Sequence, residues 1–129
     1  MGKEAQGFSK FGKDFQESLC QMILQDRPFA DTIMEVLDIG FLELHYLRVF
    51  VQKIFEYREE FGVHPTYKIM IAIIRAEIEG ENVATQQQLR NYFARIHDAQ
   101  VSGSDYIKKV SLEFCRKQKL RRLLMMPSN

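Results

Sequence analysis

Tryptophan is absent from this chain of 129 residues, and proline, glycine and cysteine are scarce, with three, seven and two residues respectively. So little glycine and proline excludes a collagen-like repeat, and a hydrophobic content of 46% excludes a disordered chain. Cys20 and Cys115 lie far apart and neither belongs to a Cys-x-x-Cys pair, which excludes a disulfide scaffold and predicts packed core thiols. The length predicts one domain with one compact core.

Long apolar runs are also missing. The longest strongly apolar run, from Ile69 to Ile74, is far too short to cross a bilayer. Residues 1–7 lack the apolar core of a signal peptide, and the cysteine usage is typical of a reducing compartment. We therefore expect a cytoplasmic protein that does not associate with membranes.

The net charge is small, because 18 Lys and Arg residues oppose 17 Asp and Glu residues to leave +1. No global field would draw the whole chain onto nucleic acid. From Asp105 onward, however, basic residues greatly outnumber acidic ones. Such residues can simply stabilise the end of a helix through its dipole, or they can contact phosphates or an acidic partner. The candidate contact residues are Arg116, Lys117, Lys119, Arg121 and Arg122.

Apolar residues recur every three or four positions along most of the chain, which is the period of an amphipathic helix. The first helix is expected to begin within residues 8–14 and to end near Gln25, because Pro28 disfavours its continuation. Asp31 is expected to cap a short second helix over Thr32–Leu37.

Glycine and capping residues divide the rest of the chain. Gly62 is expected to end a long third helix, and Thr66 to cap a fourth that runs to about residue 79. Thr85-Gln86-Gln87-Gln88 matches the capping box of a fifth helix, and Pro127 would stop a sixth. The third and sixth helices are expected to begin near residues 44 and 105.

No alternating strand pattern occurs in the sequence, so the predicted fold class is all-α. The expected architecture is a small bundle of about four helices followed by a helical hairpin. The corresponding segments are a flexible N-terminus, a globular helical subdomain, the hairpin and the start of a linker, at residues 1–12, 13–82, 83–124 and 125–129.

Patterns typical of catalysis or of a cofactor site are missing from the sequence. Neither GxxxxGK[ST] nor GxGxxG is present, the three histidines form no HExxH pair, and no Glu-x-x-His of a di-iron bundle occurs. Glu56, Glu59 and Glu60 lie close together, but Lys53 and Arg58 stand among them, which is typical of a solvated face. We expect no catalytic, cofactor or metal site in this chain.

A series of landmarks follows the expected helices in order. They are Phe15 to Leu24, Phe41, Phe50 with Ile54, Glu56-Tyr57, Val63-His64-Pro65-Thr66, the Ile-rich fourth helix, and Arg121-Arg122-Leu123-Leu124. Over about residues 13–124 this order resembles the N-terminal domain of DnaB-type replicative hexameric DNA helicases, and the fit is closest to the phage branch of that family.

The resemblance implies a non-catalytic assembly and interaction domain. In that family the domain is a helical bundle with an extended hairpin. Hairpins of neighbouring subunits pair in a collar above the motor ring, and the collar docks primase or a helicase loader. ATP hydrolysis belongs to a motor domain that this chain does not contain, so the chain itself is not expected to be an enzyme. Its contact with DNA is expected to be weak or indirect.

On this interpretation, apolar faces of the hairpin would pair subunits into a dimer or a ring, because an isolated helix pair leaves one face uncovered. The expected association surface consists of the apolar stripe residues of the last two helices: Leu89, Tyr92, Phe93, Ile96, Ile107, Val110 and Phe114.

Two other interpretations stay open. The helicase-binding region of bacterial primases is built on a similar helical plan. A small helical nucleic-acid-binding or regulatory protein would instead use the basic last helix, and its affinity for DNA would then fall steeply with salt.

Overall fold

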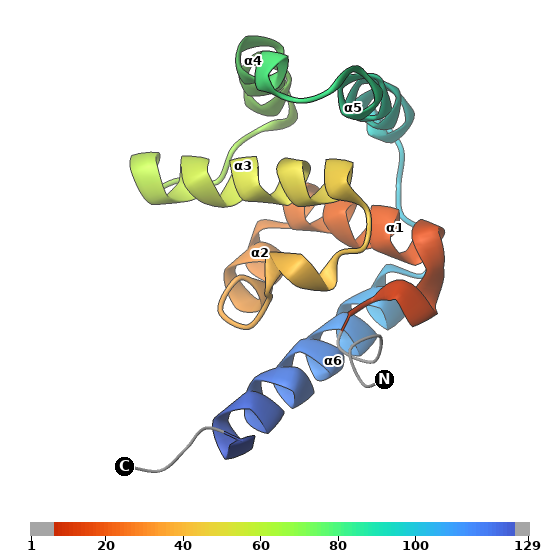
Figure 1. The fold of residues 1–129 in the computed structure, drawn as a ribbon, viewed down its shortest axis with the longest axis vertical. Helices are drawn as coiled ribbons and strands as arrows, with labels where there is room; N and C mark the ends of the chain where they lie inside the picture. Colours follow the sequence, from red (N-terminus) through yellow and green to blue (C-terminus); the bar gives the residue numbers. More distant parts are fainter. Residues whose placement is uncertain (1–6, 126–129) are drawn as a thin grey trace.

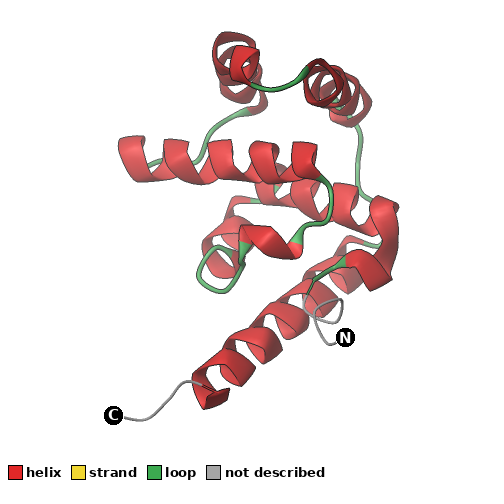
Figure 2. Cartoon of the chain, viewed as in Figure 1, coloured by secondary structure: helices red, strands yellow, loops and turns green. Residues whose placement is uncertain are grey.

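The computed structural model describes residues 7–125, in which helices and loops occur but no strand (Figure 2). This confirms the predicted all-α class. The first six residues of the expected flexible N-terminus, the stop at Pro127 and most of the expected linker lie outside the described residues. The α-helices are α1 Gly12–Gln25, α2 Arg27–Ile33, α3 His45–Phe61, α4 Tyr67–Glu77, α5 Val83–Ile96 and α6 Ser104–Met125, and short 3-10 turns occupy Ser9–Phe11, Ile39–Phe41 and Ile78–Gly80.

Helix α1 lies at the centre of the bundle and contacts α2, α3 and α6 (Figure 1). Helix α3 in turn packs against α5 and α4, while α6 also packs against α2. Figure 1 shows α4 and α5 together at one end of the molecule and α6 at the opposite end. The bundle therefore has two well-separated ends, and each carries helices with an outward-facing side.

The expected hairpin of residues 83–124 is not what the structure shows, because α5 packs on α3 whereas α6 packs on α1 and α2. The connection between them is fastened to α1. Gln21 Nε2 donates to the Ala99 carbonyl at 2.9 Å, and Gln25 Nε2 lies 3.4 Å from the same oxygen. Asp98 has a φ of 61°, in the left-handed region that redirects a chain. The two helices are thereby held on different sides of the core.

The junction between α3 and α4 lies where the sequence predicted it. Gly62 has a φ of 72° and ends α3 in the left-handed conformation that glycine adopts without strain. Thr66 accepts a hydrogen bond from the Ile69 N–H at 3.1 Å and begins α4. The 3-10 turn after α4 carries helical structure to Gly80, close to the expected end.

The second helix begins five positions earlier than predicted. Asp26, rather than Asp31, is its cap, and it accepts a hydrogen bond from the Phe29 N–H at 3.0 Å. Pro28 stands in the first turn, where a missing N–H leaves no hydrogen bond unmade, so it starts this helix as well as ending the previous one. The expected range Thr32–Leu37 was therefore wrong.

The start of α5 also differs from the prediction. Asn82 accepts a hydrogen bond from the Thr85 N–H at 2.8 Å, so the helix begins at Val83 and Thr85 lies within its first turn. The Thr85 side chain is buried against the core instead of capping the helix. An asparagine immediately upstream has satisfied the free N–H that the capping box would have served.

One group of aromatic side chains fixes α6 to the start of the chain. Phe8 is completely buried, with its ring centroid 4.9 Å from that of Phe114 in α6 and 5.9 Å from that of Phe41. Its backbone N–H donates to the Phe41 carbonyl at 2.8 Å. Within the stretch expected to be flexible, Phe8 is therefore packed in the core and Phe11 packs partly against it, because aromatic rings of this size stabilise the fold strongly when buried.

A second aromatic group joins α3 to α5. The Phe50 ring lies 5.1 Å from Tyr92 and 5.2 Å from Phe93, measured between centroids. Both aromatic groups belong to one cluster of buried residues that runs through the bundle. The segments 13–82 and 83–124 therefore share a core, and they are not a globular subdomain with a hairpin attached to it.

Candidate functional site

The residues expected to pair subunits lie mostly in the hydrophobic core of the bundle. Six of the seven are buried and Val110 is partly buried. Phe50 covers the aromatic pair of α5, and Phe8 covers Phe114, so these side chains do not form an exposed association surface. The apolar stripe was correctly located, but it is covered by the same chain. The buried members are Leu89, Tyr92, Phe93, Ile96, Ile107 and Phe114.

The five basic candidates of α6 divide into two groups. Arg122 donates to Asp38 Oδ2 at 2.7 Å, and its guanidinium lies 5.0 Å from the centre of the Phe41 ring. Lys119 Nζ lies 3.3 Å from the carbonyl oxygen of Glu35. These two cations fasten α6 to the segment after α2. The other three are exposed and make no ion pair with any described residue: Arg116, Lys117 and Arg121.

The ion pair with Arg122 changes the pKa of the Asp38 carboxyl. Burial raises the pKa of its carboxyl, but the hydrogen bond and charge of Arg122, with a hydrogen bond from the Gly40 N–H, bring the pKa below its ordinary value. The pair therefore stays charged at neutral pH. It holds the inner side of α6 against the bundle as far as Arg122, close to the end of the described helix.

The last turns of α6 carry exposed leucines, and we name residues 116–125 the α6 arm. Leu120, Leu123 and Leu124 are 57%, 58% and 76% exposed. At 100° per residue they share one face of the helix, opposite the buried Cys115 and Gln118. The arm therefore presents an apolar strip, set among the three unpaired cations, on the side of α6 that faces away from the bundle.

A groove of about 410 Å³ lies between α3 and α4. Tyr57 and Phe61 of α3 and Ile69 and Ile73 of α4 form its apolar lining. Phe61 is 57% exposed, and its ring centroid lies 4.7 Å from that of Tyr57. This α3–α4 groove is thus a place where large apolar side chains line an open concave surface, as is typical of sites that bind an apolar partner.

Acidic side chains surround the same groove. Glu56 and Glu60 come from α3 and Glu77 comes from α4. Lys53 Nζ lies 2.7 Å from Glu77 and 3.6 Å from Glu56, so it compensates part of this negative charge. Glu60 forms no ion pair with any described residue, and the rim keeps a net negative charge.

The sequence alone indicated only part of this groove. Glu56 and Glu60 are four residues apart and so are Tyr57 and Phe61, which predicts adjacent acidic and aromatic rows on one helix. The acidic residues of this segment were interpreted as part of a solvated face. What the sequence did not show is that α4 lies beside it, because that placement depends on how the whole bundle packs.

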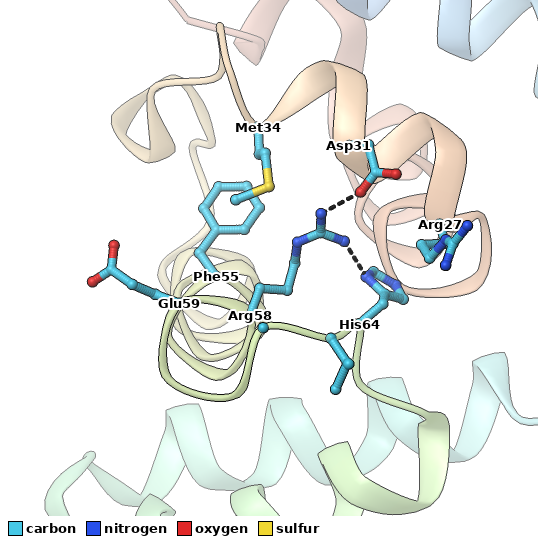
Figure 3. A pocket seen from close by; sticks show the side chains of 9 residues that line it. Arg27, Asp31, Met34, Phe55, Arg58, Glu59 and His64 are labelled. Carbon is cyan, nitrogen blue, oxygen red and sulfur yellow. Dashed lines mark hydrogen bonds and ion pairs between the residues drawn. The ribbon is translucent and has the colours of Figure 1, made fainter.

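A second cavity, of about 650 Å³, lies between α2 and the end of α3 (Figure 3). Arg58 reaches into it and donates both to the Asp31 carboxylate and to His64 Nδ1, the latter at 2.7 Å. His64 Nε2 in turn lies 2.7 Å from the carbonyl oxygen of Leu24. The polar groups at the centre of this cavity therefore bind one another and tie the α3–α4 connection to α1 and α2.

These contacts fix the protonation of His64. A guanidinium can only donate, so Nδ1 must accept, and the Leu24 carbonyl requires a proton on Nε2. Burial lowers the pKa of His64 and the Arg58 charge lowers it further, against the opposing effect of the Leu24 carbonyl. The ring is therefore neutral, with its proton on Nε2, and this cavity holds a structural contact.

Glu17 forms a buried hub between α1, α3 and α5. Arg95 donates to its two carboxylate oxygens at 2.6 and 3.0 Å, and Tyr46 donates to it as well. Burial raises the pKa of the Glu17 carboxyl, but the hydrogen bonds from Arg95 and Tyr46 and the Arg95 charge bring it below its ordinary value. Tyr92 donates to the Glu17 backbone carbonyl. This hub aligns three helices and is engaged by the chain itself.

The two cysteines are buried and unbonded, which confirms that they are core thiols. Burial raises the pKa of Cys115 to about 12 and that of Cys20 well above its ordinary value, so neither is a ready nucleophile. In the part of the chain that the structure describes, no group of His, Cys, Asp or Glu side chains could hold a metal ion. No helix within residues 7–125 is long and apolar enough to span a membrane.

Comparison with protein-family models, with curated proteins and with solved structures finds no match for this chain. The candidate functional surfaces therefore rest on the geometry of the chain itself. Two of them combine exposed apolar side chains with a net charge: the basic α6 arm and the α3–α4 groove, whose three glutamates outnumber Lys53.

Proposed function

We propose that this chain is a non-catalytic assembly domain of the kind found at the N-terminus of DnaB-type replicative DNA helicases. The observation that carries the proposal is the α6 arm, where three leucines are exposed on one face of an ordered helix. Exposed apolar side chains gathered on one face are typical of a surface that binds another protein. Association would then use the arm in place of the buried stripe of α5 and α6.

The order of landmarks along the chain supports the helicase assignment. The long α3 carries Phe50, Ile54 and the Glu56-Tyr57 pair, and Val63-His64-Pro65-Thr66 connects it to the Ile-rich α4. The basic Leu-containing segment forms the end of α6. In such a domain the partners would be further copies of the chain, and primase or a helicase loader. The domain would bind no cofactor and would act in the cytoplasm.

The mass of the protein in solution tests this proposal. Light scattering on a size-exclusion column, over a series of concentrations, should show a dimer or a larger assembly for the unmodified chain. The double variant Leu120→Glu, Leu123→Glu should shift the assembly to monomer, because it places charge in the apolar strip. Circular dichroism should show unchanged helicity, since both side chains are exposed. An unmodified chain that is monomeric at every concentration would contradict an assembly role.

A second function is favoured by one observation: Arg116, Lys117 and Arg121 are exposed and unpaired among the described residues. Three such cations on one helix could contact the phosphates of single-stranded DNA. Titration with a labelled oligonucleotide at increasing salt separates the two functions. We expect weak binding, as for an assembly domain, whereas tight binding that falls steeply with salt would favour a nucleic-acid-binding regulator.

A further inference from the structure

The α6 arm and the α3–α4 groove match each other in both polarity and charge. We infer that the α6 arm of one copy of this chain binds in the α3–α4 groove of a second copy, so that copies associate head to tail. This inference rests on the proposed assembly function and names the two surfaces that carry it.

The apolar fit follows the pattern of a helix bound in a groove. Leu120, Leu123 and Leu124 stand at positions i, i+3 and i+4, the spacing of anchor residues in such contacts. The groove offers Phe61, which is 57% exposed, and Ile69, which is 37% exposed, on its two walls. Its volume of about 410 Å³ can accommodate apolar side chains of an incoming helix.

The charges at the two surfaces are opposite. Arg116, Lys117 and Arg121 border the leucines of the arm, whereas Glu56, Glu60 and Glu77 border the groove. None of the three arm cations makes an ion pair with a described residue, so each is available to a partner. Opposite charges around an apolar contact favour the encounter and fix its register.

The two surfaces of one copy cannot meet. Figure 1 shows α4 and α6 at opposite ends of the molecule. The inner side of α6 is fastened to the bundle by Lys119, by Arg122 and by the buried Cys115. The arm must therefore find its groove on another copy. A contact between two different surfaces repeats from copy to copy, and it closes into a ring or extends as a fibre according to the rotation it imposes.

The charges disfavour the alternatives. Two arms placed face to face would bring Arg116, Lys117 and Arg121 of both copies together, and like charges repel. A further groove of about 620 Å³ lies between α4 and α5, but Lys68 and Arg75 line it. That rim is basic, so it would repel a basic arm as well. The α3–α4 groove instead carries Glu56, Glu60 and Glu77.

Two charge-reversal variants test the inference. The arm variant is Arg116→Glu, Arg121→Glu, and the groove variant is Glu56→Lys, Glu60→Lys. All four side chains are exposed, so circular dichroism should show that both variants fold. In sedimentation velocity over a concentration series, each variant alone should be monomeric, with self-association at least tenfold weaker than in the unmodified chain. Only a contact that uses both surfaces predicts the same loss from both variants.

Mixing the two variants gives the sharper result. The arm variant keeps an intact groove and the groove variant keeps an intact arm, so one contact can form between them. We expect the mixture to recover the assembly, because the intact arm meets the intact groove and the remaining reversed arm and reversed groove are also opposite in charge. A chain that carries all four substitutions should associate again, since its reversed charges are still opposite.

Arg75→Glu, Arg90→Glu is the matched control, because it changes the net charge as the arm variant does, but on α4 and α5. It should associate like the unmodified chain. If the arm variant is monomeric while the groove variant still associates, the arm binds another surface, and the inference fails while the assembly function stands. If the unmodified chain is monomeric throughout, both fail. A mixture of the variants that stays monomeric also overturns the head-to-tail contact.

Discussion

At the scale of one residue, a proton on His64 has the clearest energetic consequence. The neutral ring accepts from Arg58 and donates to the Leu24 carbonyl, and a protonated ring could not accept from Arg58. Burial and the Arg58 charge place the folded-state pKa of His64 below its ordinary value. The unfolded chain therefore binds a proton more readily than the folded chain in the range between the two pKa values.

The sign of the pH dependence follows. The stability that this arrangement contributes is present above the unfolded pKa, about 6.5, and is lost as the pH falls from there toward the folded pKa. The midpoint of urea unfolding should thus be lower at about pH 5.5 than at about pH 7.5. His64→Gln, whose amide can accept and donate without titrating, should reduce this difference. His97→Gln, at an exposed ring, should keep it, and an unchanged difference in His64→Gln would contradict the assignment.

At the scale of the helices, the end of α3 depends on the backbone of Gly62. With a φ of 72°, an alanine there would be strained, even though no atom lies within 4 Å of the added Cβ. Gly62→Ala should therefore lower the free energy of unfolding by about 1 kcal/mol. Gly80→Ala also meets open space but has no left-handed φ, so it should leave stability within about 0.5 kcal/mol. Urea unfolding of the two variants checks the pair, and equal effects would contradict it.

How well the helices were predicted depended on the kind of signal. Gly62 and Thr66 stand alone as stop and start signals, so the junction between α3 and α4 was predicted to the residue. At α2 and α5 two capping residues compete within a few positions, and the upstream one captured the free N–H. Sequence patterns do not show which of two nearby capping residues begins the helix, because that depends on which first turn best buries its apolar face.

At the scale of the whole molecule, one core predicts one unfolding transition. Phe114 of α6 contacts Phe8 and Phe41, and its truncation to alanine should cost about 3–5 kcal/mol, a large part of the stability of a domain this size. Circular dichroism follows the unfolding of all helices. Tyrosine fluorescence mainly follows α3, α4 and α5, because four of the five tyrosines lie there. In Phe114→Ala the unfolding midpoints measured by circular dichroism and by tyrosine fluorescence should shift by the same amount. A separate early loss of helicity would indicate that α6 unfolds by itself.

The site was less predictable than the fold. The stripe from Leu89 to Phe114 was identified as apolar, but periodicity does not tell whether the same chain or a second one covers a helix face. The structure answers this with Phe50 and Phe8, which come from distant parts of the sequence. The basic residues of α6 were identified, whereas their division into fastened and exposed groups depends on Asp38 and Glu35, across the bundle.

The length and fastening of α6 also give the bundle a mechanical direction. Its 22 residues form a rod of about 33 Å, with Phe114 at its middle and the Arg122 pair near its end. A force along this rod would load the aromatic cluster and the ion pair together. A force applied across the end of the rod would break the Arg122–Asp38 ion pair first and separate the aromatic cluster around Phe114 afterwards. The chain should therefore resist traction along α6 better than traction across it.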